Sequence, residues 1–210
     1  MAQYWNEELT AASWSALLEF SKAYDCTVIG GWAVYLWART QKSKDLDLAV
    51  GYAALDGMRS AYRVDKNDRL KKYEIKMEKF DVDLYLPHYS KLALPIEEVI
   101  AGAVKIGGIK AASAESLLVL KQGAQIDRKG TVKGRKDTID LLSLLLRSPI
   151  DLAKYGQLLK THGLEGYRRE LFFALSDFDE RDCAYLGMNF KEFAGWRRGK
   201  KEELKKTYSE

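Results

Sequence analysis

The sequence predicts an α+β protein in which a small mixed β-sheet, backed by helices, is followed by a helical C-terminal half. Short segments with β-branched residues or strict alternation occur only before residue 113. Segments with helical spacing of apolar residues lie between them. From Ser113 onward the spacing is helical almost throughout. We therefore expect two regions, residues 1–112 and residues 113–210.

The expected elements of the first region alternate between helix and strand. Apolar spacing predicts helices over 6–24, 32–40 and 53–62, and Pro95 suits the first turn of a fourth helix, over 95–101. The β-branched run 26–29 and the alternating run 45–50 predict two strands. Two more alternating runs, 73–77 and 80–86, predict an antiparallel pair. The Gly-Gly turn within 104–109 predicts a small hairpin.

The second region is expected to be helical. Ser113 is a suitable N-cap for a helix that ends near Asp127. A loop rich in glycine and lysine leads to a second helix over 135–147, which Pro149 stops. Three or four further helices are expected between this proline and residue 210.

Composition narrows the functional classes. The 210 residues are 47% hydrophobic, which allows a substantial core, and the net charge is only +4. Two cysteines outside any CxxC motif and two histidines argue against a disulfide scaffold and against a cysteine- or histidine-based metal site. No run of 18 apolar residues and no export signal is found, so we expect no membrane association and a cytoplasmic location.

Two pairs of aspartates are the most informative feature. Asp45 and Asp47 lie two residues apart on an expected strand, as do Asp81 and Asp83. Residues at i and i+2 of a strand share a face, so each pair points to one side. Neighbouring carboxylates repel each other unless a cation lies between them. If the two strands are neighbours, the acids would suit two Mg²⁺ ions and displacement at phosphorus.

Gly30 and Gly31 lie between an expected strand and an expected helix. Free backbone N–H groups at such a junction bind phosphate, and glycine lets the phosphate approach closely. A Gly-Gly pair alone is usually a turn, and an Asp-x-Asp pair alone is usually a solvated strand face. Their combination, 13 residues apart, is more specific and fits nucleoside triphosphate chemistry.

At these residues the sequence resembles the polymerase-β-like nucleotidyltransferase superfamily. Its signature is Gly-Gly or Gly-Ser, a spacer, and an Asp-x-Asp flanked by apolar residues, matched here by residues 29–31 and 45–48. The resemblance implies a nucleotidyltransferase core in residues 1–112, with Asp45, Asp47 and a third acid as metal ligands. Asp83 fits as the third acid, and Asp81 is the competing residue.

Within this superfamily the chain most resembles the AbiEii-type nucleotidyltransferases, which include toxins of toxin–antitoxin systems. Residues 79–81 resemble their Lys-x-Asp motif, Ser113 and Lys121 their Ser-to-Lys helix motif, and residues 137–140 their Asp-x-x-Asp motif. The first of these matches favours Asp81, so the third acid stays open. The resemblance implies that residues 113–147 complete the active site.

Three polar residues have two interpretations each. Lys121 either reaches the triphosphate or is a lysine of an amphipathic helix. Asp137 either acts in the site, where it orients Lys121 or helps to activate an acceptor hydroxyl, or is an acid that the helix dipole favours in the first turn of its helix. Ser43 either binds a phosphate or tightens the loop before Asp45.

The leading hypothesis is an enzyme that transfers a nucleoside monophosphate from a nucleoside triphosphate and releases pyrophosphate. We expect two Mg²⁺ or Mn²⁺ ions as cofactors. The acceptor is an RNA end, a protein hydroxyl or a small molecule. The alternative is a catalytically retired nucleotide-binding or regulatory module of the same fold.

Two basic stretches extend the list of expected partners. Residues 121–136 contain six Lys or Arg and one acid, and residues 197–206 contain six and two. Such runs are more often a solvated face than a binding surface, yet they make RNA a further expected partner. The AbiEii resemblance adds a cognate antitoxin protein.

Overall fold

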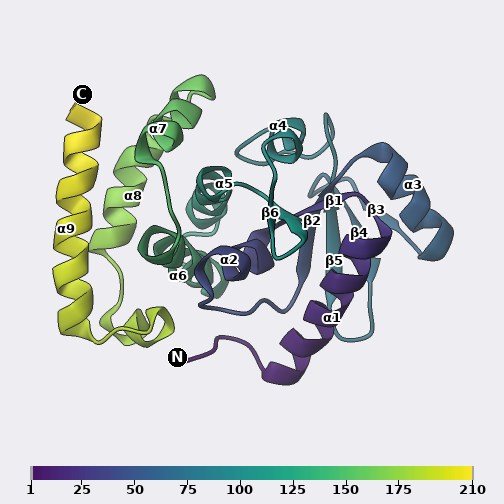
Figure 1. The fold of residues 1–210 in the computed structure, drawn as a ribbon, viewed down its shortest axis with the longest axis horizontal. Coiled ribbons are helices and arrows are strands. Elements are labelled where there is room, and N and C mark those ends of the chain that lie inside the picture. The colour runs from purple at the N-terminus through teal and green to yellow at the C-terminus, as the bar shows by residue number, and fades with distance from the viewer. Residues whose placement is uncertain (1, 210) are drawn as a thin grey trace.

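The computed structural model describes residues 2–209. Residues up to 111 form both helices and strands, and the elements after residue 111 are all helical (Figure 1). The strands are β1 Cys26–Ile29, β2 Leu46–Val50, β3 Asp65–Asn67, β4 Lys72–Lys76, β5 Asp81–Tyr85, β6 Val104–Ile106 and β7 Ile109–Ala111. The helices of the first half are α1 Glu7–Ala23, α2 Gly30–Ala38, α3 Tyr52–Ala61 and α4 Ile96–Ala101. The later helices are α5 Ala114–Asp127, α6 Val132–Arg147, α7 Leu152–Thr161, α8 Tyr167–Ser176, the 3-10 helix η1 Glu180–Leu186 and α9 Phe190–Ser209.

All seven strands form one mixed sheet in the order β3-β4-β5-β2-β1-β7-β6. The central strand β2 runs antiparallel to β1 and parallel to β5. The expected pairing of β4 with β5 and the Gly-Gly hairpin of β6 and β7 are both confirmed as antiparallel. The α+β class and the mixed sheet predicted from the sequence are therefore confirmed.

Helix α2 connects the two halves of the protein. It packs on β1 and β2 and also contacts α5 and α6. Its side chains are almost all apolar, and Trp32 is 1% exposed. One continuous hydrophobic cluster extends from the sheet through α5 and α6 to α9. Among the helices described, none is long and apolar enough to span a membrane.

The limits of several elements differ from expectation. Helix α2 begins at Gly30, two residues early, because Gly30 adopts a φ of 67° that turns the chain directly from β1 into the helix. Helix α6 begins at Val132 because Thr131 caps it by accepting the Gly134 N–H. Asp137 therefore lies in the second turn, so the first-turn interpretation of this residue is wrong. The short edge strand β3 was not expected.

Candidate functional site

Two aspartates meet where the central strands of the sheet run side by side. Asp47 of β2 lies opposite Asp83 of β5 in parallel register. Side chains opposite each other on neighbouring strands leave the same face, so the two carboxylates are adjacent. Asp45 lies just before β2, and its Oδ1 accepts the Asp81 backbone N–H at 3.3 Å. Asp45, Asp47 and Asp83 all line one cleft of about 750 Å³.

Asp81 has a different position. It is the first residue of β5, and its carboxylate forms an ion pair with Lys76 at 2.9 Å. The side chain is 44% exposed and is not among the residues that line the cleft. Of the two acids left open by the sequence, the fold thus brings Asp83 into the cleft and leaves Asp81 outside it. The role of either as a metal ligand stays a prediction.

The cleft acids strongly influence one another. Burial and the neighbouring Asp83 and Asp45 raise the pKa of Asp47 from 3.8 to about 6. The Tyr85 hydroxyl donates to Asp47 Oδ1 at 3.4 Å. Burial also raises the pKa of Asp83, although Lys72 opposes this shift. Holding these carboxylates together in the fold therefore costs electrostatic free energy, and a bound cation would remove this cost.

Lys72 was missed by the sequence analysis. Its ammonium group lies 2.6 Å from Asp83 Oδ2 and 2.8 Å from Glu74 Oε1. Glu74 lies directly opposite Asp83 in the β4–β5 ladder, and Lys72 is two residues before it on the same face. The alternating pattern of β4 places Lys72 and Glu74 on one face, but their contact with Asp83 can be inferred only when the β4–β5 register is known.

The glycine pair forms the wall of the cleft beside Asp47. A Cβ at Gly30 would lie 2.0 Å from Asp47 Oδ2, and one at Gly31 would lie 2.5 Å from Ser43 Oγ. Gly30 is the first residue of α2, and no larger residue fits there without moving Asp47. Ser43 donates from its hydroxyl to the Asp45 carbonyl at 3.1 Å, so it tightens the loop and also lines the cleft.

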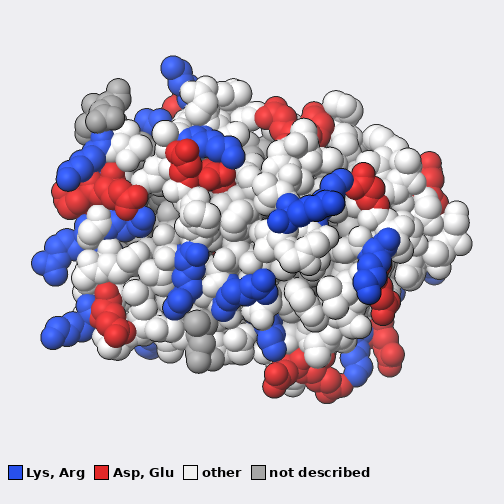
Figure 2. Space-filling view, in the orientation of Figure 1, with Lys and Arg blue, Asp and Glu red and all other residues white. Residues whose placement is uncertain are grey.

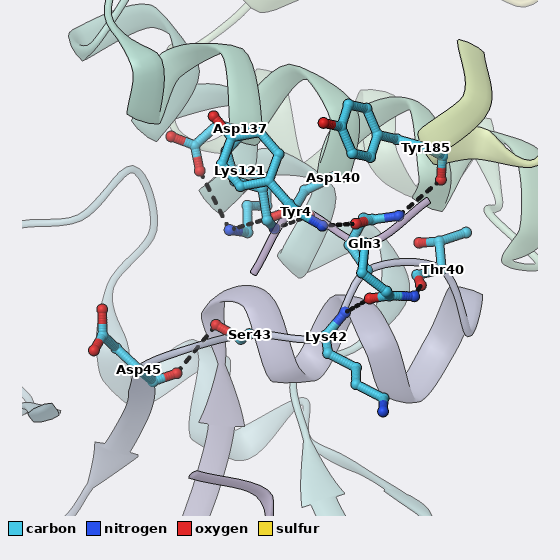
Figure 3. A network of polar contacts seen from close by, with 12 residues as sticks. Gln3, Tyr4, Thr40, Lys42, Ser43, Asp45, Lys121, Asp137, Asp140 and Tyr185 are labelled. Carbon is cyan, nitrogen blue, oxygen red and sulfur yellow. Dashed lines mark hydrogen bonds and ion pairs between the residues drawn. The ribbon is translucent and has the colours of Figure 1, made fainter. Parts of the chain in front are cut away.

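Helices α5 and α6 supply a buried charge network on another side of the cleft (Figure 3). Lys121 of α5 lies 3.3 Å from Asp137 Oδ1 and 2.8 Å from Asp140 Oδ2. Burial alone would lower the pKa of Lys121, but Asp140 and Asp137 outweigh it and raise the pKa above its usual value. The predicted pairing of Lys121 with Asp137 is thus present in the fold, and the ammonium group is a fixed positive charge in the cleft.

Two further basic residues of this network were not singled out from the sequence. Lys136 contacts Asp140 Oδ1, and Arg128 lies 2.7 Å from Asp137 Oδ2. Burial would raise the pKa of Asp140, but Lys121 and Lys136 together hold it below its usual value. The i,i+4 spacing of Lys136 and Asp140 is a helical pairing signal that the sequence contained.

The cleft acids form part of a candidate coordination shell for a magnesium ion. Across residues 2–209, no three Asp, Glu, His or Cys side chains are close enough to form a complete metal site. Mg²⁺, however, is usually held by one or two carboxylates together with substrate phosphates and water. Asp83 Oδ1 is buried and has no hydrogen-bond partner among the described residues. Asp47 and Asp83, beside the Gly30–Gly31 wall, therefore fit a hard cation that arrives with a phosphate.

Several basic residues line the cleft without an acidic partner. Lys44, Lys91 and Lys133 form no ion pair with any residue in the described part of the chain. Elsewhere the charges are mixed: on the face shown in Figure 2, red side chains accompany the blue ones over α9. The cleft is thus lined by three lysines whose charge no described acidic side chain neutralises.

The fold was compared with solved structures and with known sequences. No protein-family model and no curated protein sequence matches the chain. Among solved structures, it is similar to a candidate nucleotidyltransferase from H. pylori, with a TM-score of 0.56, 15% identity and 98% coverage of both chains. It is also similar to the antibiotic-resistance factor ANT(2'')-Ia, with a TM-score of 0.50, 14% identity, and coverage of 81% of this chain and 97% of that one.

These similarities concern the fold, since the identities are low. The first neighbour spans nearly the whole chain, including the C-terminal helices that matched no known motif. The mixed sheet and the helices packed on it thus adopt the fold found in nucleotidyltransferase structures. The chain has a nucleotidyltransferase fold.

Proposed function

We propose that the protein is a metal-dependent nucleotidyltransferase that transfers a nucleoside monophosphate from a nucleoside triphosphate to an acceptor hydroxyl. The observation that carries the proposal is the Asp47–Asp83 pair, which lies beside the Gly30–Gly31 junction in a cleft. Asp45 lines the same cleft and is proposed as a further metal ligand. The polymerase-β-like resemblance and the fold both support this assignment.

Each residue has a proposed role in the transfer. The first backbone N–H groups of α2 and the Ser43 hydroxyl bind phosphate oxygens, and Lys121 neutralises charge on the triphosphate. A bound Mg²⁺ or Mn²⁺ would stabilise charge on the reacting oxygens. The acceptor oxygen attacks the α-phosphorus, the bond from the α-phosphorus to the bridging oxygen breaks, and pyrophosphate leaves. A cleft carboxylate accepts the acceptor's proton.

The acceptor is proposed from the charge of the cleft. Lys44, Lys91 and Lys133 form no ion pair within residues 2–209 and favour an acceptor that carries several phosphates, so RNA ends are the first class to test. One structural neighbour is an antibiotic-resistance factor, so a small-molecule hydroxyl is the second class. A protein hydroxyl is the third. The AbiEii-type toxin role and a cognate antitoxin stay predictions of the sequence resemblance.

The position of the transferred label tests the reaction. The protein is incubated with each nucleoside triphosphate, labelled on the α- or the γ-phosphate, with Mg²⁺ or Mn²⁺ and each acceptor class in turn. We expect α-label on the acceptor, release of pyrophosphate, and no transfer by the Asp45→Asn, Asp47→Asn double variant. Transfer of γ-label would identify a kinase instead. Nucleotide binding without any transfer would support the retired module.

A further inference from the structure

The segment Ala2–Trp5, here called the N-terminal strap, lies across the loop that leads into β2. The Tyr4 N–H donates to Gln41 Oε1 at 2.9 Å, and Gln41 Nε2 donates to the Ala2 carbonyl at 2.8 Å. Gln3 Nε2 donates to the Thr40 carbonyl at 3.2 Å, and Gln3 Oε1 accepts the Lys42 N–H at 3.3 Å (Figure 3). Gln41 is fully buried, so its two bonds to the strap are partly shielded from water. The strap therefore has a defined path.

The strap is also fixed to the helical half of the protein. The Tyr4 hydroxyl donates to the Val132 carbonyl at the start of α6 at 3.1 Å. Gln41 Nε2 donates to the Tyr185 carbonyl of η1 at 2.9 Å, and the rings of Tyr4 and Tyr185 lie 5.6 Å apart. Residues from three distant parts of the chain thus hold Trp5 at one position on the cleft wall.

Trp5 differs from the other four tryptophans. Trp32 is part of the hydrophobic core, and Trp14, Trp37 and Trp196 pack against it. Trp5 does neither, and it lines the cleft together with the acids and Gly30. Its one ring contact within the described residues is Tyr4, edge-on at 5.2 Å and 72°. Its indole N–H donates to no described residue. A large, partly buried aromatic ring therefore lines the cleft without packing on the hydrophobic core.

We propose that Trp5 stacks on the base of the nucleotide that binds in this cleft. The assignment rests on the proposed function, and it names the part of the substrate that the acids and glycines leave without a partner. Phosphates bind to charges and backbone N–H groups, whereas a base needs a flat apolar surface. Every base has a π-face, so stacking on an aromatic side chain accepts all four bases. Trp5 therefore contributes affinity rather than base selection.

Binding measured with and without a base tests this role. Calorimetry would compare each nucleoside triphosphate with inorganic tripolyphosphate, in the presence of Mg²⁺, for the wild type, Trp5→Phe and Trp5→Leu. We expect Trp5→Leu to weaken binding of all four nucleotides by about 5- to 100-fold and to leave tripolyphosphate within about 2-fold of the wild type. Trp5→Phe keeps an aromatic face and is the matched control, with a smaller loss. Melting temperatures should be similar for all three proteins, since Trp5 does not pack on the core.

The other outcomes each contradict a stated claim. If Trp5→Leu weakens the binding of nucleotides and of tripolyphosphate equally, Trp5 only shapes the phosphate site. If Trp5→Leu leaves nucleotide binding unchanged, Trp5 has no role in it. A raised acceptor KM with unchanged nucleotide affinity would assign the ring to the acceptor and overturn the proposal. A wild type that binds no nucleotide would overturn both this proposal and the proposed function, whereas the first three outcomes leave the latter intact.

Discussion

At Asp47, burial and two neighbouring carboxylates act in the same direction on one ionisable group. The pKa rises from 3.8 to about 6, so the folded protein binds a proton that the unfolded chain releases between these two values. The stability contributed by this residue therefore falls as the pH rises through that window and stays reduced above pH 6. A metal that enters with a nucleotide would remove this cost.

Asp47→Asn should accordingly stabilise the metal-free protein. We expect a gain of about 1–3 kcal/mol at pH 7.5 that disappears near pH 4, because asparagine never ionises. Urea unfolding in the presence of EDTA at the two pH values measures it. Asp81→Asn is the matched control, since it removes only a half-exposed ion pair with Lys76 and should change stability by less than about 1 kcal/mol. Equal stability of Asp47→Asn and wild type at pH 7.5 would contradict the electrostatic account.

Gly30 combines two constraints that Gly51 lacks. Its φ of 67° disfavours any side chain, and a Cβ would lie 2.0 Å from Asp47 Oδ2. We expect Gly30→Ala to cost about 1–3 kcal/mol of stability and to abolish nucleotide binding. Gly51 has open space around it and a φ of −77°, so Gly51→Ala should have little effect on either measurement. Thermal melts and nucleotide titrations of both variants check this; similar results for the two would refute it.

At the scale of elements, helices α5 and α6 are joined by buried charges. Asp140 is fully buried between the ammonium groups of Lys121 and Lys136. Asp140→Asn would leave two buried cations with insufficient negative charge, and we expect a loss of about 3–5 kcal/mol. Asp137→Asn should cost less, because its partner Arg128 is 42% exposed and can turn to water. Denaturant unfolding of both variants should reproduce this order; the reverse order would show that Asp137 dominates the network.

The N-terminal strap depends on one side chain of the loop before β2. Gln41→Leu keeps the shape but removes hydrogen bonds to Ala2, Tyr4 and Tyr185. We expect a loss of about 1–3 kcal/mol and faster hydrogen exchange at residues 3–5. Gln157→Leu, on an exposed helix face, is the control and should alter neither. Unchanged exchange in residues 3–5 of Gln41→Leu would mean that other contacts hold the strap.

The ends of helices and strands could be predicted where a capping residue or another local sequence feature marks them. Ser113 caps α5 as expected, because its hydroxyl accepts the Ser116 N–H three residues ahead. The start of α2 was placed late because nothing in the sequence indicates that Gly30 would adopt a left-handed φ. Strand β3 was missed because it contains only Asp65, Lys66 and Asn67, residues that pair with β4 without an apolar face.

Site residues that are close in the sequence could be predicted, whereas site residues that only the tertiary structure brings together could not. Asp45, Asp47, Gly30 and Gly31 lie within 18 consecutive residues, and the sequence alone indicated that they share a site. Trp5 and Lys72 also line the cleft, but only the tertiary structure places them there. No spacing rule connects Trp5 to Val132, because their proximity depends on the strap, η1 and α6 together.

The two regions divided at residue 112 share one core. Helix α2 contacts both the sheet and helices α5 and α6, and one hydrophobic cluster includes Leu48 of β2 and Leu141 of α6. We therefore expect the regions to unfold together, although they contribute different parts of the cleft. Urea transitions followed by tryptophan fluorescence and by far-ultraviolet circular dichroism should coincide, and the fragment 1–112 should not fold alone. Two separate transitions, or a folded fragment 1–112, would show that the cleft lies between independent domains.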